Sequence, residues 1–119
     1  MRKSVAGAAL LSMIFLVPQV WAGERRDEAR AQVAFGIAVA QKGLWKEALF
    51  RWEKAVEIDP TYAAAYNHLA IAYEHEGQFE KARQAYEKAV ELDPKNTFVQ
   101  QNFEFFKEIN DRASSRNPG

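Results

Sequence analysis

Hydrophobic and polar positions follow a helical pattern over most of the chain, and the pattern occurs twice. The segment WEKAVEIDP at 52–60 is closely matched by YEKAVELDP at 86–94. In each copy apolar residues recur at helical spacing, and small residues recur together with large ones. Such a period predicts a repeat architecture, in which each unit buries its apolar face against the next unit.

The two units are equal in length, and each is expected to contain two amphipathic helices. The first unit covers 29–62 and the second covers 63–96. Gly43 and Gly77 stand where the first helix of each unit must end, a position that often requires a positive φ. The proline of each Asp-Pro pair ends the second helix, because proline lacks an N–H and clashes with the preceding turn.

Small and large residues occupy matching positions in the two units, which predicts close packing of the two helices within each unit. The small residues are Gly36 and Ala70, Ala48 and Ala82, and Ala55 and Ala89. The large residues expected opposite them are Phe35 and Leu69, Trp45 and Phe79, Trp52 and Tyr86, and Ile58 and Leu92.

A fifth helix is expected over 97–112, where a third unit would start. Asn96 or Thr97 can accept hydrogen bonds from the free N–H groups of its first turn. The side chains expected to pack back on the second unit are Val99, Phe103 and Phe106. No matching second helix follows, so this helix is expected to close the stack, with 113–119 as a flexible tail.

The repeated positions resemble the tetratricopeptide repeat, whose pattern is W-x2-L-G-x2-Y, then A-x3-F, then P. The second unit fills each position with a residue of the right size class: Tyr66, Leu69, Ala70, Tyr73, Ala82, Tyr86 and Pro94. In the first unit Gln32 and Val39 depart from the pattern, on a helix that has no preceding repeat to pack against. The resemblance covers 29–96 and implies an all-α fold, an α-α superhelix of five helices.

Residues 1–22 are predicted to be a secretory signal peptide. Arg2 and Lys3 precede an apolar run over 5–17, and Ala22 provides a small residue for cleavage. A membrane-spanning helix takes about 20 residues, so this shorter run favours cleavage over a retained anchor. Residues 23–28 would then extend the first helix. The expected localisation is outside the cytoplasm, in a bacterial periplasm.

Charge and cysteine content narrow the functional classes. After cleavage 14 basic and 16 acidic side chains would remain, without a basic patch. Nucleic-acid binding usually requires such a patch, so it is not expected, and neither is membrane insertion of the mature chain. The chain has no cysteine, so its stability must come from helix packing rather than from disulfides.

No catalytic constellation, phosphate-binding loop or cofactor motif is present, so the protein is not expected to be an enzyme or to bind a cofactor. His68 and His75 lie on one predicted helix, two turns apart, which is about 10 Å along the axis. That spacing is too long for both to hold one metal ion without other ligands. Trp45 and Trp52 are expected in the core.

The resemblance implies a protein-interaction scaffold, an adaptor of the cell envelope. In this family the first helix of each pair lines a concave face that holds a peptide or a partner helix. The groove residues that carry over are Val33, Ile37, Asn67, Ile71, Glu74, Phe98, Phe105 and Ile109. Most are apolar, which predicts an apolar or amphipathic partner segment, and the amide of Asn67 could hold a bound backbone.

Other arrangements remain open at this point. The carboxylate clamp of chaperone-binding members is not expected, because Val33, Ile37 and Phe98 occupy its positions. Tight curvature could close the apolar side chains on one another, or the closing helix could cover them. Two repeats are also fewer than the three or so that stability usually requires. A homodimer formed through the concave face or the closing helix is therefore the alternative function.

Overall fold

The structure, a computed structural model, describes the backbone of residues 17–116 and the side chains of residues 21–116. Its five α-helices are α1 (Val17–Ala40), α2 (Trp45–Ile58), α3 (Ala63–His75), α4 (Phe79–Leu92) and α5 (Thr97–Arg116). Most of the predicted signal peptide lies outside the described residues, and the predicted cleavage position after Ala22 falls within α1.

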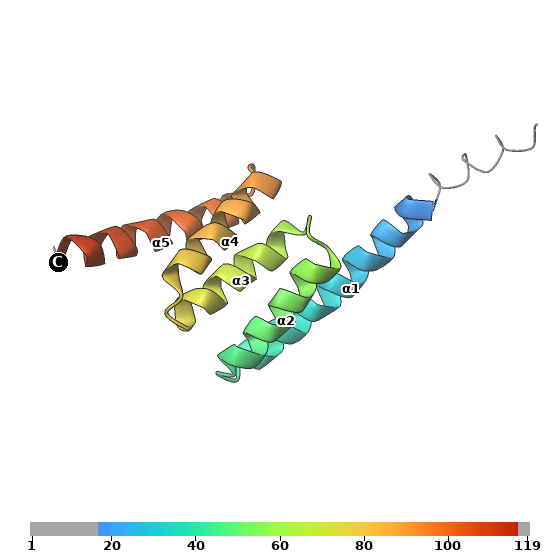
Figure 1. Ribbon diagram of the computed structural model, residues 1–119, viewed down its shortest axis with the longest axis horizontal. Helices are drawn as coiled ribbons and strands as arrows, with labels where there is room; N and C mark the ends of the chain where they lie inside the picture. Colours follow the sequence, from blue (N-terminus) through green and yellow to red (C-terminus); the bar gives the residue numbers. More distant parts are fainter. Residues whose placement is uncertain (1–16, 117–119) are drawn as a thin grey trace, which may run out of the picture.

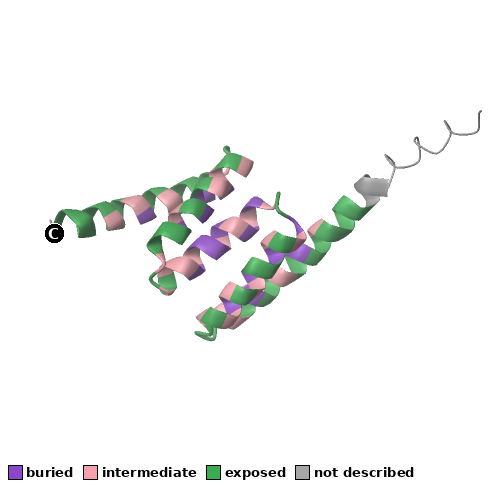
Figure 2. Ribbon diagram, in the orientation of Figure 1, coloured by how far each residue is buried: buried purple, intermediate pink, exposed green. Residues whose placement is uncertain are grey.

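The helices pack as consecutive antiparallel pairs, α1 with α2 and α3 with α4, and α5 lies against α4 (Figure 1). The central helix is α3, which contacts all four of the others. Figure 2 shows that α3 is buried or half-buried along nearly its whole length, whereas residues 21–25 of α1 and 111–116 of α5 are exposed. The all-α, five-helix fold is therefore confirmed. No helix in the described part of the chain has the length and apolarity needed to cross a membrane.

The helix ends lie where the sequence predicts them. Gly43 and Gly77 have φ angles of 78° and 74°, values that glycine adopts without a Cβ clash. The two outer helices, α2 and α4, end at Ile58 and Leu92, two residues before their prolines. The helix-ending residues therefore recur in the structure at the same interval as in the sequence repeat.

The closing helix starts as expected and ends later than expected. Asn96 caps it, since its Oδ1 accepts hydrogen bonds from the backbone N–H groups of Phe98 and Val99 at 3.1 and 3.2 Å. The helix continues to Arg116, four residues beyond the predicted end. An ion pair between Glu108 and Arg112, one turn apart, supports the last turns.

Each helix pair is built around one large aromatic side chain. Trp52 and Tyr86 occupy the same repeat position, and each is only 2% exposed. Trp52 donates a hydrogen bond from Nε1 to the carbonyl oxygen of Val33 at 3.1 Å. A Cβ atom on Gly36 would lie 2.3 Å from that same Nε1. The small-against-large packing predicted from the sequence is confirmed at this contact.

Two of the large residues do not pack as predicted. Phe35 is 47% exposed and Phe79 is 51% exposed, so the expectation that they face small residues in the core is wrong. The repeat equivalent of Phe35 is Leu69, which is 5% exposed because the first unit covers it. In the described chain no helix pair precedes α1 to cover Phe35 in the same way. Phe79 lies at the start of α4, where α5 does not cover it.

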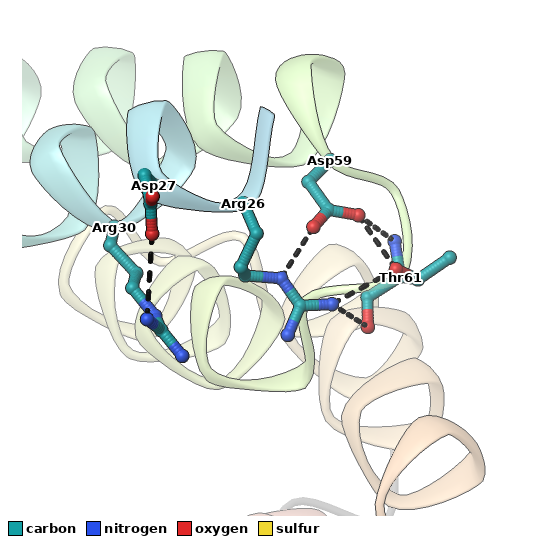
Figure 3. A network of polar contacts seen from close by, with 5 residues as sticks. All are labelled: Arg26, Asp27, Arg30, Asp59 and Thr61. Carbon is teal, nitrogen blue, oxygen red and sulfur yellow. Dashed lines mark hydrogen bonds and ion pairs between the residues drawn. The ribbon is translucent and has the colours of Figure 1, made fainter. Parts of the chain in front are cut away.

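A polar network fixes the predicted N-terminal extension of α1 to the turn between α2 and α3 (Figure 3). Arg26 donates from Nε to Oδ2 of Asp59 at 2.5 Å, and from Nη2 to Oγ1 of Thr61 at 3.0 Å. Thr61 also donates its backbone N–H and its hydroxyl to Oδ1 of Asp59. Burial alone would raise the pKa of Asp59, but hydrogen bonds from Thr61 and Arg26 outweigh it, and the pKa is lowered.

Candidate functional site: a concave groove

Two adjoining hollows lie along the face formed by the inner helices α1, α3 and α5. The first hollow has a volume of about 300 Å³ and is lined by Ile37, Ala40, Gln41, Trp45, Trp52, His68 and Ile71. The second hollow has a volume of about 290 Å³ and is lined by Ile71, Glu74, Tyr86, Gln101, Asn102, Phe105 and Phe106. Ile71 lines both hollows, so they adjoin at α3, and the two together are called the groove.

The two hollows are equivalent in the repeat. A shift by one repeat period, the step that leads from Trp52 to Tyr86, converts the lining of the first into that of the second at five positions. The pairs are Ile37 and Ile71, Ala40 and Glu74, Trp52 and Tyr86, His68 and Asn102, and Ile71 and Phe105. The groove thus follows from the repeat: α3 lines both hollows, α1 and α2 line the first, and α4 and α5 line the second.

The rings of Trp45, Trp52 and His68 line the first hollow. His68 stacks on Trp52 with ring centroids 5.1 Å apart, and His75 stacks on Trp45 at 3.5 Å. Burial lowers the pKa of His68 below its ordinary value of 6.5, which favours the neutral ring. Each of the two histidines thus stacks on a different tryptophan. In the part of the chain that the structure describes, no cluster of histidine and acidic side chains could hold a metal ion.

The second hollow is more polar. The hydroxyl of Tyr86 donates a hydrogen bond to Oε2 of Glu74 at 2.6 Å. Burial raises the pKa of Tyr86 above its ordinary value, and the bond to Glu74 raises it further. Glu74 is half-buried, so this bond holds a carboxylate at the edge of the groove. The apolar side chains of Ile71 and Phe105 line the same hollow.

The structure brings together half of the predicted groove residues. Four of them line the hollows: Ile37, Ile71, Glu74 and Phe105. Phe98 and Ile109 are 59% and 52% exposed, but neither lines the two hollows. They extend the apolar surface along α5 beyond the groove.

Val33 and Asn67 were expected on the open face and are buried instead. Val33 is 6% exposed and belongs to the core around Trp52, so the expectation that it has no core role is wrong. Asn67 is 2% exposed, and its Oδ1 accepts a hydrogen bond from Nδ2 of Asn102 at 3.2 Å. That bond ties α3 to α5, so the amide oxygen is occupied within the chain.

Sequence reasoning missed the side chains at the bottom of the groove. Trp52 and Tyr86 are core residues as predicted, but one edge of each also reaches a hollow. His68 and Asn102 were not expected to line the groove, because they lie outside the family's usual concave positions. The signal that could have found them is the repeat period, which makes these two positions equivalent.

Comparisons with known proteins agree with this geometry. A family profile described as "Tetratricopeptide repeat" matches residues 63–96, and a second profile described as "TPR repeat" matches residues 36–77. Repeats of this family typically form non-catalytic scaffolds that bind other proteins. No match was found among curated protein sequences.

Several solved structures are similar to this chain. PilF of Pseudomonas aeruginosa is 35% identical, with a TM-score of 0.68 over 73% of this chain and 40% of its own. MamA is 26% identical, with a TM-score of 0.64 over 70% of this chain and 48% of its own. The chain therefore spans less than half the length of either protein.

The tetratricopeptide repeat domain of OM64 from Arabidopsis shares the fold. It is 22% identical, with a TM-score of 0.67 over 74% of this chain and 73% of its own. Paired helices at a constant period, two family profiles that together span 36–96, and these structural similarities agree. Through residues 36–96, the chain belongs to the tetratricopeptide repeat family.

Proposed function

We propose that the protein is a non-catalytic adaptor that binds an apolar or amphipathic segment of another protein in the concave groove. The observation that carries this proposal is that the two hollows adjoin, with Ile71 in the lining of both. Half-buried or exposed apolar side chains from three helices line them, namely Ile37, Ile71 and Phe105. An apolar surface at the centre of a hollow is typical of a binding interface.

The groove favours a peptide or a single helix over a globular surface. Each hollow of about 300 Å³ can take one or two large side chains, and both hollows lie side by side along α3. An amphipathic helix presents apolar side chains at intervals of three and four residues. Such a helix could place one anchor beside Ile37 and the next beside Phe105, with Ile71 between them.

We further propose that the adaptor works in the cell envelope, on the basis of the N-terminal sequence. Cleavage after Ala22 would remove the first six residues of α1. Trp21 is 61% exposed, so its loss would remove little packing, and the Arg26 network would remain. N-terminal sequencing of the protein from its host should then start at Gly23. Recovery from the cytoplasmic fraction of a chain that still begins at Met1 would contradict export.

Crosslinking in the host tests the adaptor function. The complete chain is expressed from its own locus, crosslinked lightly and purified, and is compared with Ile71→Arg. A matched control is Phe79→Arg, because Phe79 is 51% exposed and lines neither hollow. We expect one distinct protein to be recovered with the wild type and with Phe79→Arg, and to be lost with folded Ile71→Arg.

Two results would contradict the proposal. If Ile71→Arg recovers the same protein as the wild type, the partner binds elsewhere on the surface. If the groove captures only further copies of the chain, the concave face is a self-association surface, as in the alternative function.

A further inference from the structure

One end of the helix stack carries an apolar face that has no cover in the described chain. Ala31, Phe35 and Ala38 on α1 are all exposed, and Phe35 is 47% exposed. Their repeat equivalents on α3 are Ala65, Leu69 and Ala72, which are 0%, 5% and 0% exposed because they pack in the core shared with the first unit. Terminal repeats normally have a polar outer face. Here α1 keeps the residue types through which α3 docks on α2.

Two residues of opposite charge flank this end face. Glu28 lies seven residues before Phe35 and Lys42 lies seven residues after it. The spacing through Ala31, Phe35 and Ala38 alternates three and four residues, so the stripe follows one side of the helix and the turn after it. Among the ion pairs within residues 21–116, none includes Glu28 or Lys42.

We propose that two copies of this chain pair through the end face, with their α1 helices antiparallel and the twofold axis beside Phe35. Glu28 lies on α1 roughly 10 Å along the axis from Phe35, and Lys42 lies on the opposite side of Phe35, in the turn that follows α1. An antiparallel pair therefore places Glu28 of each copy beside Lys42 of the other, twice per dimer. A parallel pair would place like charges together, so the charge pattern selects the antiparallel arrangement.

The centre of the face suits close approach of two helices. Ala31 and Ala38 on either side of Phe35 leave room for the aromatic ring of the other copy. The guanidinium of Arg51 lies over the Phe35 ring at 4.1 Å and near the Phe50 ring at 5.5 Å. This contact supports Phe35 from the side of α2 and leaves its other side open to the second copy.

The pairing completes the packing of the stack and forms a closed contact, because the same surface is used by both copies. Two repeats are fewer than the three or so that usually stabilise such a stack, and the second copy supplies a neighbour to α1. The groove stays open, since Ile37, Ala40 and Gln41 line the first hollow while the exposed stripe runs through Ala31, Phe35 and Ala38. A dimer would present two grooves.

Sedimentation equilibrium of the complete, purified chain tests the proposal. The wild type is followed up to about 1 mM, where even a Kd near 1 mM, corresponding to about −4.1 kcal/mol, would be visible. We expect a concentration-dependent dimer, weakened at least about tenfold by Phe35→Asp. Because Phe35 is exposed, Phe35→Asp should leave the circular dichroism spectrum unchanged. Phe105→Asp, on the closing helix, is the control and should dimerise like the wild type.

Charge reversal then tests the orientation of the pair. Glu28→Lys and Lys42→Glu should each weaken the dimer about tenfold, because each creates two like-charge contacts. An equimolar mixture of the two variants should dimerise like the wild type, since each Lys at 28 then meets a Glu at 42.

Three outcomes would overturn the proposal. A wild type that stays monomeric throughout the concentration range would exclude the dimer. A dimer that Phe35→Asp leaves intact and Phe105→Asp disrupts would place the contact on the closing helix. Failure of the mixture to recover, with both single variants weakened, would exclude the antiparallel arrangement.

Discussion

The two hollows of the groove occupy the same repeat positions, yet the first is lined mostly by apolar side chains while the second is more polar. In the first, Trp45 lines the hollow and stacks on His75 with ring centroids 3.5 Å apart. The equivalent pair in the second is Phe79 and Ile109, which are 51% and 52% exposed. Identical backbone positions thus give different surfaces, because the side chains that meet across the next helix differ.

The closing helix differs from the first helix of each unit at one packing position. Gly36 in the first unit and Ala70 in the second let the outer helix approach the inner helix closely. The equivalent residue on α5 is Glu104, which is exposed and pairs with Lys107. A long charged side chain at this position prevents a further helix from packing in the same way.

The largest effect is expected where the first unit packs most tightly. Gly36→Ala places a Cβ against the indole of Trp52, and we expect the free energy of unfolding to fall by about 1–3 kcal/mol. Urea unfolding followed by circular dichroism measures it. The reverse change in the second unit, Ala70→Gly, should cost only about 0.5–1 kcal/mol, the usual cost of glycine in a helix.

A compensating variant makes this test specific. Gly36→Ala combined with Trp52→Tyr reproduces the Ala70 and Tyr86 pair of the second unit. The combined loss of stability should be smaller than the sum of the two single losses, because the smaller ring leaves room for the methyl group. Strict additivity would show that the two positions do not contact each other as described.

The next effect concerns the polar hollow. Tyr86→Phe removes the hydroxyl that donates to Glu74 at 2.6 Å, and hydrogen bonds to charged groups contribute about 1.5–3 kcal/mol when buried. Because Glu74 is half-buried, we expect a loss of about 1 kcal/mol in chemical unfolding. Tyr73→Phe is the matched control, since its hydroxyl makes a longer, exposed bond of 3.3 Å to Glu53. Equal losses for both variants would contradict a special role of the Glu74 bond.

A smaller difference is expected between the two Asp-Pro turns. Asp59 accepts hydrogen bonds from Arg26 and Thr61, whereas Asp93 accepts a 3.2 Å bond from the side chain of Asn96. Asp59→Asn should therefore lower stability by about 1 kcal/mol, more than Asp93→Asn does. Hydrogen exchange should show the loss mainly in the first turns of α1 that Arg26 holds. The opposite ranking of the two variants would contradict this account.

The smallest effect is a pH dependence of the first hollow. The pKa of His68 in the folded chain is below 6.5 because of burial, so below that pH the unfolded chain binds more protons. Stability should decrease as pH falls through about 6.5 towards the folded pKa. In His68→Asn, which copies the equivalent Asn102, this decrease should be smaller. The comparison is the urea midpoint at about pH 8 and about pH 5.5, on either side of the ordinary histidine pKa. Equal decreases in the wild type and in His68→Asn would contradict the assigned role of His68.

Much of the fold could be predicted from the sequence because one pattern occurs twice. The positions of Gly43, Gly77 and the two prolines determine where helices end, and those are local effects. Burial was harder to predict, because the exposure of Phe35 depends on what stands beside α1 rather than on its own repeat position.

The groove was predicted in part for the same reason. Ile37 and Ile71 lie on the sides of α1 and α3 that line the groove, and they could be identified from the repeat register. Asn67 could not, since its burial depends on Asn102 of the next helix. The stacking of His68 on Trp52 likewise joins two helices, and a periodic pattern on one helix does not reveal such a contact.

The most direct test of the groove uses a displayed library of random peptides, selected on the purified complete chain. We expect peptides with two apolar anchors, which bind the wild type and Phe79→Arg equally and bind Ile71→Arg at least about tenfold more weakly. Isothermal titration of the selected peptides measures the affinities. Equal binding to Ile71→Arg, with its fold intact by circular dichroism, would show that the two hollows sharing Ile71 are not the binding site.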